Sequence, residues 1–204
     1  MELMLIAAVL TWTLIIATLA GALVLAFVAN KPTRHWIIIP VAVLVIVAIV
    51  FTALGGLATA PHYLFTMIAI ALLVAIGIVG GSPAVLVVLD LAGSDKNLAG
   101  EHGGILVEDA GPKKVSREIL RGGATIGYLE RLIIMGAALI GQYAAVAIVV
   151  AVKGLGRFNE LENAAARERF IIGTLASIAW AGACVAPAII GWANAFASGV
   201  FGWA

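Results

Sequence analysis

Charged side chains are scarce in this chain of 204 residues, at 11% of the total. A typical soluble domain has about 25%. Hydrophobic residues make up 63%, which is more than one water-soluble core of this length can bury. The formal net charge of +1 provides no basic surface to attract nucleic acid. The composition therefore excludes a soluble enzyme, a nucleic-acid-binding domain and a disordered tail, and it indicates a polytopic membrane protein.

Cysteine is equally rare, because Cys184 is the single copy. One cysteine can neither form an internal disulfide nor build a zinc site of the usual Cys and His spacing. Motifs of the HExxH, Walker A, GxSxG and CxxC types are also absent from the sequence. We therefore predict no metal, no cofactor and no catalytic residues.

The sequence does contain long apolar runs, each near or above the roughly 20 residues that a spanning helix needs. They predict an all-α bundle of about five transmembrane helices, forming one integral membrane domain over residues 1–204. The predicted spans are 3–29, 36–57, 62–91, 129–152 and 170–190. An extramembrane loop at 93–127 and a short charged loop at 153–169 lie between the later spans.

The third run contains a cluster of residues that disturb helices. Gly80, Gly81, Ser82 and Pro83 follow one another, and Pro83 removes one backbone hydrogen bond from any helix that contains it. We predict a segment that is kinked or broken here, with a kinked single crossing favoured over a re-entrant pair. Broken helices mark the binding sites of many transporters.

Charge is confined to a few stretches, and its distribution predicts an orientation. Of the 23 charged residues, 12 lie within 95–131 and seven lie within 153–169. Five crossings place eight Lys and Arg residues on one side of the membrane and four on the other, which puts the N-terminus outside. A re-entrant third segment would divide them evenly and move the 153–169 loop inside.

The 93–127 loop carries a hairpin signal. The stretch 105–108 is strand-like, Gly111 and Pro112 indicate a turn, and 114–117 can return as a second strand. Ser116 is alternatively suited to cap a short helix.

A few polar side chains lie within the apolar runs. Gln142 falls near the middle of the fourth run, where a buried amide needs a hydrogen-bond partner. It is either a link between helices or the polar lining of a solute path. Asp90 is an acid in the third run, and it either contributes to such a path or emerges at the membrane surface.

Small residues four apart in the last two runs predict close packing of helices. The positions are Ala137, Gly141 and Ala145 in the fourth run and Gly173, Ser177 and Ala181 in the fifth. They serve either packing within the chain or an interface with a second copy or another membrane subunit.

The stretch 120–180 combines glycine-rich and charged motifs. They are Arg121-Gly122-Gly123, Ile126-Gly127-Tyr128-Leu129-Glu130-Arg131, Gly141-Gln142, Lys153-Gly154-Leu155-Gly156-Arg157-Phe158 and Glu168-Arg169-Phe170-Ile171-Ile172-Gly173-Thr174. This third of the chain resembles a group of uncharacterised, mostly actinobacterial membrane proteins and, more distantly, the DUF3307-type membrane family. The resemblance carries no assigned activity. It implies that the polar side chains of these motifs form one site or interface: Glu130, Arg131, Gln142, Lys153, Arg157, Glu168 and Arg169.

Three functions follow from these patterns. An accessory or structural subunit of a membrane complex fits the sparse intramembrane charge and the lack of catalytic motifs best. The alternative is a channel or transporter for an ion or small solute, which Gln142 and the segment around Pro83 support. The third is a membrane-embedded enzyme acting on lipid, with Glu130 and Asp90 as acid and base. The expected location is a bacterial plasma membrane, and the expected partners are lipid and further copies or other subunits.

Overall fold

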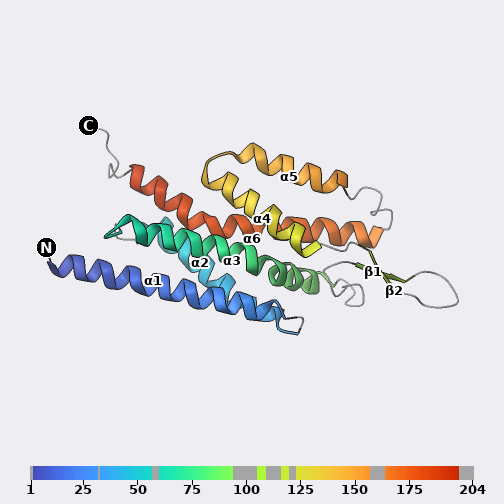
Figure 1. The fold of residues 1–204 in the computed structure, drawn as a ribbon, viewed down its shortest axis with the longest axis horizontal. Helices are drawn as coiled ribbons and strands as arrows, with labels where there is room; N and C mark the ends of the chain where they lie inside the picture. Colours follow the sequence, from blue (N-terminus) through green and yellow to red (C-terminus); the bar gives the residue numbers. More distant parts are fainter. Residues whose placement is uncertain are drawn as a thin grey trace.

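The computed structural model describes residues 2–31, 33–56, 60–93, 105–108, 116–119, 123–156 and 164–197. It confirms the all-α fold, and Figure 1 shows an elongated bundle. The helices are α1 (Glu2–Ala29), the short 3-10 helix η1 (His35–Ile37), α2 (Ile38–Ala53), α3 (Tyr63–Leu91), α4 (Gly123–Leu139), α5 (Tyr143–Gly156) and α6 (Ala164–Ala197).

Four segments are long and apolar enough to cross a bilayer, namely α1, η1 with α2, α3, and α6. Large apolar side chains cover their outward faces. Examples are Leu10 on α1, Val47 on α2 and Leu175 on α6, each at least 60% exposed. Soluble monomers rarely expose this much contiguous apolar surface to water. The chain is therefore an integral membrane protein whose helices contact lipid.

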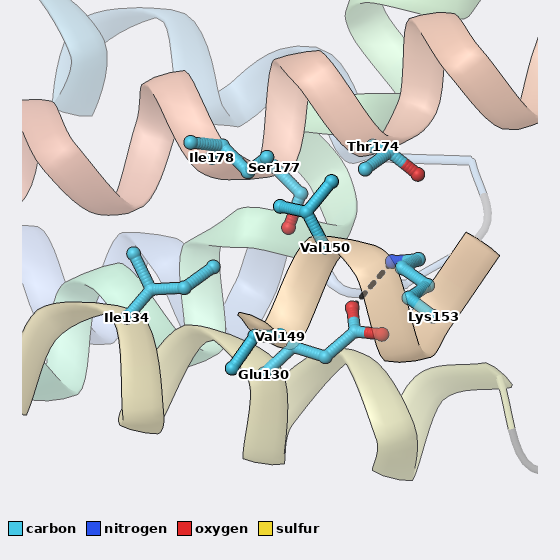
Figure 2. Close-up of a pocket in the computed structure, with 8 residues that line it drawn as sticks. All are labelled: Glu130, Ile134, Val149, Val150, Lys153, Thr174, Ser177 and Ile178. Carbon is cyan, nitrogen blue, oxygen red and sulfur yellow. Dashed lines mark hydrogen bonds and ion pairs between the residues drawn. The ribbon is translucent and has the colours of Figure 1, made fainter. Parts of the chain in front are cut away.

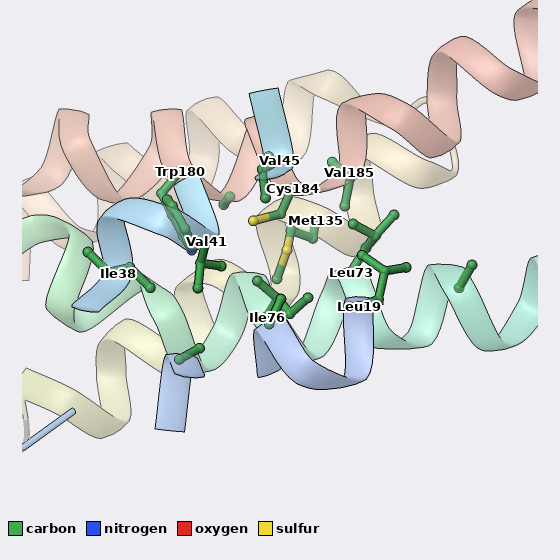
Figure 3. Packing of buried hydrophobic residues seen from close by; sticks show 14 of the residues in the cluster. Leu19, Ile38, Val41, Val45, Leu73, Ile76, Met135, Trp180, Cys184 and Val185 are labelled. Atoms are coloured by element: carbon green, nitrogen blue, oxygen red, sulfur yellow. The ribbon is translucent and has the colours of Figure 1, made fainter. Parts of the chain in front are cut away.

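The core of the bundle surrounds α3, which packs against α1, α4 and α6. Figure 3 shows the apolar side chains that meet there from five helices, among them Leu19, Ile38, Val41, Val45, Leu73, Ile76, Met135, Trp180, Cys184 and Val185. On α1 the buried residues include Ala22, Ala26 and Ala29, whose small side chains allow the helix to approach closely.

The third predicted segment is one continuous helix in the structure, so the alternative of a broken, re-entrant pair does not hold there. Pro83 lies inside α3 and lacks the N–H that would bond to the Val79 carbonyl. The side chain of Asn30 supplies the missing donor, with its Nδ2 atom 3.0 Å from the Val79 oxygen. A polar residue directly after α1 therefore stabilises the disturbed turn of α3.

The structure corrects the predicted span at 129–152, which is divided into α4 and α5. α4 ends in a Schellman turn: the Gln142 N–H donates to the Ala137 carbonyl at 2.8 Å, and the Gly141 N–H donates to the Ala138 carbonyl at 3.1 Å. Gly141 has a φ of +74°, a conformation that favours glycine. Gly141, predicted as a packing position, is thus a helix terminator.

α4 and α5 form a helical hairpin that enters and leaves the bundle at the same end (Figure 1). α4 runs antiparallel to α3, because Arg131 lies against Gly81 while Met135, one turn later, lies against Gly77, one turn earlier on α3. At about 1.5 Å per residue, the turn at Gly141 stops roughly 12 Å short of the first residue of α3. The 14 residues of α5 span only about 21 Å, which is less than the hydrocarbon core. The hairpin therefore turns back before it reaches the opposite end of the bundle.

Beyond the same end of the bundle lies a short antiparallel hairpin of β1 (Ile105–Glu108) and β2 (Ser116–Ile119). Ile105 pairs with Ile119, and Glu108 pairs with Ser116. This confirms the predicted strand pair over a helix capped by Ser116, with the second strand starting two residues later than expected.

The described cationic side chains all lie in one half of the bundle, between its middle, where Arg131 bonds to Ile78, and one of its ends. They are Lys31, Arg34, Arg131, Lys153, Arg167 and Arg169. The opposite end has no Lys or Arg among the residues that the structure describes. The helix ends that flank 93–127 and 153–169 lie at the same end of the bundle, whereas five crossings would place these two loops at opposite ends. The tendency of Lys and Arg to stay inside predicts that this end faces the cytoplasm.

We expect single cysteines at Ala92 and Leu155 to react with a membrane-impermeant maleimide from the same, cytoplasmic side, and a cysteine at Leu54 to react from the other. All three positions are exposed at helix ends. The parent chain, whose Cys184 is buried, serves as the unlabelled control. Labelling of Ala92→Cys and Leu155→Cys from opposite sides would restore the single crossing at 129–152.

Candidate functional site

Glu130, Arg131 and Lys153 lie near one another on the helical hairpin. Glu130 is 9% exposed and Arg131 is 2% exposed, so both are buried within the bundle. Successive residues on a helix point about 100° apart. Glu130 accordingly contacts α5, through Lys153, while Arg131 contacts α3 and α6. Two adjacent residues therefore connect α4 to three other helices.

Glu130 and Lys153 form an ion pair in which Nζ donates to Oε2. The pair is largely shielded, with the two side chains 11% and 17% exposed. The Lys153 ammonium also lies 6.0 Å from the ring centre of Phe170, within the range of a cation–π contact. A lone charge inside a membrane costs several kcal/mol, so each partner lowers the cost of the other. The pair links the far end of α5 to α4.

Arg131 is held by neutral acceptors. Its Nε donates to the Ile78 carbonyl at 3.1 Å, and its terminal nitrogens lie 3.4 Å from Ser177 Oγ and 3.3 Å from Ser82 Oγ. The guanidinium carbon also lies 5.3 Å from the ring centre of Tyr128. Within the described ranges no carboxylate forms an ion pair with it. Arg131 is thus a buried cation whose charge is not neutralised by direct contact.

The glycines of α3 provide the space for this arrangement. A Cβ atom at Gly81 would clash with the Arg131 side chain, and one at Gly80 would lie 2.8 Å from Trp180 Cζ2. Trp180 Nε1 donates to the Gly77 carbonyl at 3.1 Å. The residues that suggested a break in the helix therefore serve close approach by side chains from α4 and α6.

A small pocket lies between α4, α5 and α6 (Figure 2). Its apolar walls come from Ile134, Val149, Val150 and Ile178, and its polar lining comes from Glu130, Lys153, Thr174 and Ser177. Because Ser177 also accepts a hydrogen bond from Arg131, it connects that cation to the pocket. The Thr174 hydroxyl oxygen is buried and has no hydrogen-bond partner in the described part of the chain.

Other residues predicted for the site lie elsewhere. Gln142 is exposed in the turn between α4 and α5, about 16 Å along α5 from Lys153. Asp90 lies near the end of α3, where His35 Nε2 is 2.8 Å from its Oδ2. Glu168 is exposed and Arg169 half-buried on the first turns of α6. Arg157 lies outside the described residues.

The small residues predicted for helix packing differ in how far they are buried. Ala137, Ser177 and Ala181 are buried, whereas Ala145 and Gly173 are half-buried. Sequence reasoning missed Thr174 and Ser82 as site residues, although both stand in motifs that drew attention for other reasons. Among the described residues, no group of His, Cys, Asp or Glu is placed to hold a metal ion.

Comparison of the chain with protein-family models, with curated proteins and with solved structures finds no match in any of the three. The resemblance of 120–180 to uncharacterised bacterial membrane proteins stays a prediction.

Replacing Gly81 by alanine tests the contact between α3 and Arg131. The added Cβ must displace a side chain fixed by three hydrogen bonds, so we expect a loss of about 1–3 kcal/mol, seen as a lower melting temperature in detergent. Gly136→Ala is the matched control, because nothing lies within 4 Å of a Cβ at that helical glycine. Equal melting temperatures for the two variants would contradict the packing described.

Proposed function

We propose that this protein is a channel or transporter for a small ion or solute in a bacterial plasma membrane, with the solute path beside the α4–α5 hairpin. The supporting observation is the burial of Glu130 and Arg131, with Lys153 paired to Glu130, on a helical hairpin that turns back within the bundle. Ionisable side chains within a membrane bundle are costly and mark substrate or ion pathways in many proteins. In several transporter folds, helices that cross only part of the membrane line the solute site.

A purely structural role explains the charged cluster less well. A buried ion pair can often be replaced by apolar residues of similar volume without loss of stability. A bundle that only needed to pack α5 against α4 would gain little from Glu130 and Lys153. Arg131 additionally needs a glycine opposite it and three acceptors to be accommodated. This specific accommodation of charge favours a role for the charge itself.

Within the hairpin, α5 packs only loosely against the rest of the bundle. α5 has no buried residue, and its main packing partner is α4. The Glu130–Lys153 pair lies on one wall of the pocket and is a principal polar link between α5 and the rest of the bundle. Opening this pair would let α5 move away from α4 and enlarge the pocket. We infer that the pair acts as the gate of the path.

The double variant Glu130→Gln/Lys153→Met separates transport from stability. Glu130→Gln alone leaves Lys153 unpaired, and loss of one partner of a buried pair costs about 3–5 kcal/mol. The double variant removes both charges, so we expect a melting temperature near that of the parent. Its flux should fall at least about tenfold, which corresponds to about 1.4 kcal/mol, because an entering ion cannot open the contact once neither side chain is charged.

Flux is measured on the full chain in proteoliposomes, as the decay of an imposed gradient of potassium chloride or potassium phosphate read by a potential-sensitive dye. Glu168→Gln removes an exposed carboxylate outside the pocket and should leave flux unchanged. Parent-like flux in the double variant would rule out the gate, and no flux from the parent with either salt would count against transport.

An accessory subunit is the second candidate, and the exposed surface of α5 favours it. Ile148, Val152 and Leu155 are 63%, 64% and 76% exposed, on a helix too short to span the membrane. Another membrane subunit or a further copy of the chain would cover this surface in a complex.

Native mass spectrometry of the protein extracted from its own membrane tests this candidate. An accessory subunit would be recovered with a second protein in fixed stoichiometry, and Val152→Trp should release it because a bulky ring disrupts an interface. Val47→Trp is the matched control, since Val47 is similarly exposed on α2. Recovery of the parent without any foreign subunit would remove this candidate.

A further inference from the structure

Thr174 differs from four other threonines in the helices of this protein. Thr11, Thr13, Thr18 and Thr52 each donate their hydroxyl to the carbonyl four residues earlier, at 2.7–2.9 Å. The Thr174 hydroxyl makes no such bond, although its oxygen is buried and no other described residue accepts or donates there. A buried hydroxyl without a protein partner is unfavourable, so either a water molecule or a bound ligand has to complete it.

The Thr174 hydroxyl belongs to a set of donors around one pocket. Figure 2 shows Thr174 and Ser177 on α6, with Lys153 and Glu130 approaching from the hairpin. Ser177 Oγ accepts from Arg131, and its own proton has no acceptor among the residues that the structure describes. The pocket therefore offers an ammonium group and two hydroxyl protons.

The charge around the pocket has a definite sign. Lys153 and Arg131 carry two positive charges, and Glu130 is the single carboxylate in contact with either of them within the described residues. A cation entering the pocket would be repelled by both basic side chains. An anion would be attracted, and hydroxyl and ammonium donors are the groups that bind oxyanions well.

We propose that this pocket, when the Glu130–Lys153 pair opens and α5 moves outward, binds a small oxyanion of the phosphate or carboxylate class through Lys153 Nζ and the hydroxyls of Thr174 and Ser177. Arg131 lies behind Ser177 and supplies the second positive charge. Glu130 competes with the oxyanion for Lys153, so binding loosens the gate described above. The physiological role of the site rests on the proposed transport function, whereas binding itself can be measured separately.

The same phosphate chemistry has two sources. The pocket lies between α4, α5 and α6, in the half of the bundle that carries the Lys and Arg side chains. The ligand is thus either a free oxyanion or the headgroup of an anionic phospholipid. Both present oxygen atoms to the same three donors.

The test is the melting temperature of the full chain in a maltoside detergent, with inorganic phosphate or phosphatidylglycerol added. We expect one of the two ligands to raise the melting temperature of the parent. Thr174→Val should melt at or above the parent without ligand, because it removes an unpaired buried hydroxyl, and should bind about tenfold or more weakly. Glu130→Gln should bind more tightly, because Lys153 is released for the ligand.

Two control variants keep the test specific. Thr13→Val changes a threonine whose hydroxyl is already bonded, and Arg167→Gln removes an exposed cation outside the pocket. Both should keep the parent's response. A Thr174-dependent shift with phosphate identifies a free oxyanion, and one seen with phosphatidylglycerol alone identifies a headgroup; either supports the proposal.

The proposal is overturned if neither ligand stabilises the parent, or if Thr174→Val responds as the parent does. Binding without flux in proteoliposomes would keep the site and remove the transport function. Flux without a Thr174-dependent shift would keep transport and remove the site.

Discussion

Three successive carbonyl groups of α3 set the arrangement of the bundle. Pro83 leaves one of them without its helical donor, and side chains from three other parts of the chain bond to this turn. The bonds run from Asn30 to Val79, from Arg131 to Ile78 and from Trp180 to Gly77, at 3.0–3.1 Å. In a membrane interior an unsatisfied polar group costs several kcal/mol, so these contacts fix α1, α4 and α6 in register around α3.

The positions of the charged side chains Glu130, Arg131 and Lys153 follow from how α4 packs on α3. Arg131 can bond to α3 because glycine at position 81 leaves room for its side chain, and Glu130 is then turned toward α5. The Schellman turn at Gly141 brings α5 back along α4, which places Lys153 beside Glu130. The ion pair therefore depends on two glycines far apart in sequence. One lets α4 approach, and the other reverses the chain.

Sequence reasoning could predict the membrane class and the approximate ends of most spans, because hydrocarbon selects long apolar runs. It could not predict the division of 129–152. The run is continuously apolar, and Gly141 there suits close packing as well as helix termination. Likewise, Glu130 and Lys153 are 23 residues apart, and only the reversal at Gly141 makes them neighbours. Gly80, Gly81, Ser82 and Pro83 do disturb α3, but the helix stays continuous. The donor that replaces the missing N–H is Asn30, which is distant in sequence and cannot be identified from periodicity.

The hydrogen-bond acceptors of Arg131 determine how much positive charge acts on the pocket. A carboxylate partner would cancel its charge, whereas a backbone carbonyl and two serine hydroxyls satisfy its hydrogen bonds and leave the charge in place. Low local polarity extends the reach of that charge, so it acts on the pocket through Ser177. Glu130 balances one of the two nearby cations and leaves a surplus of positive charge. An apolar bundle has no structural need of such a surplus, and an approaching anion would neutralise it.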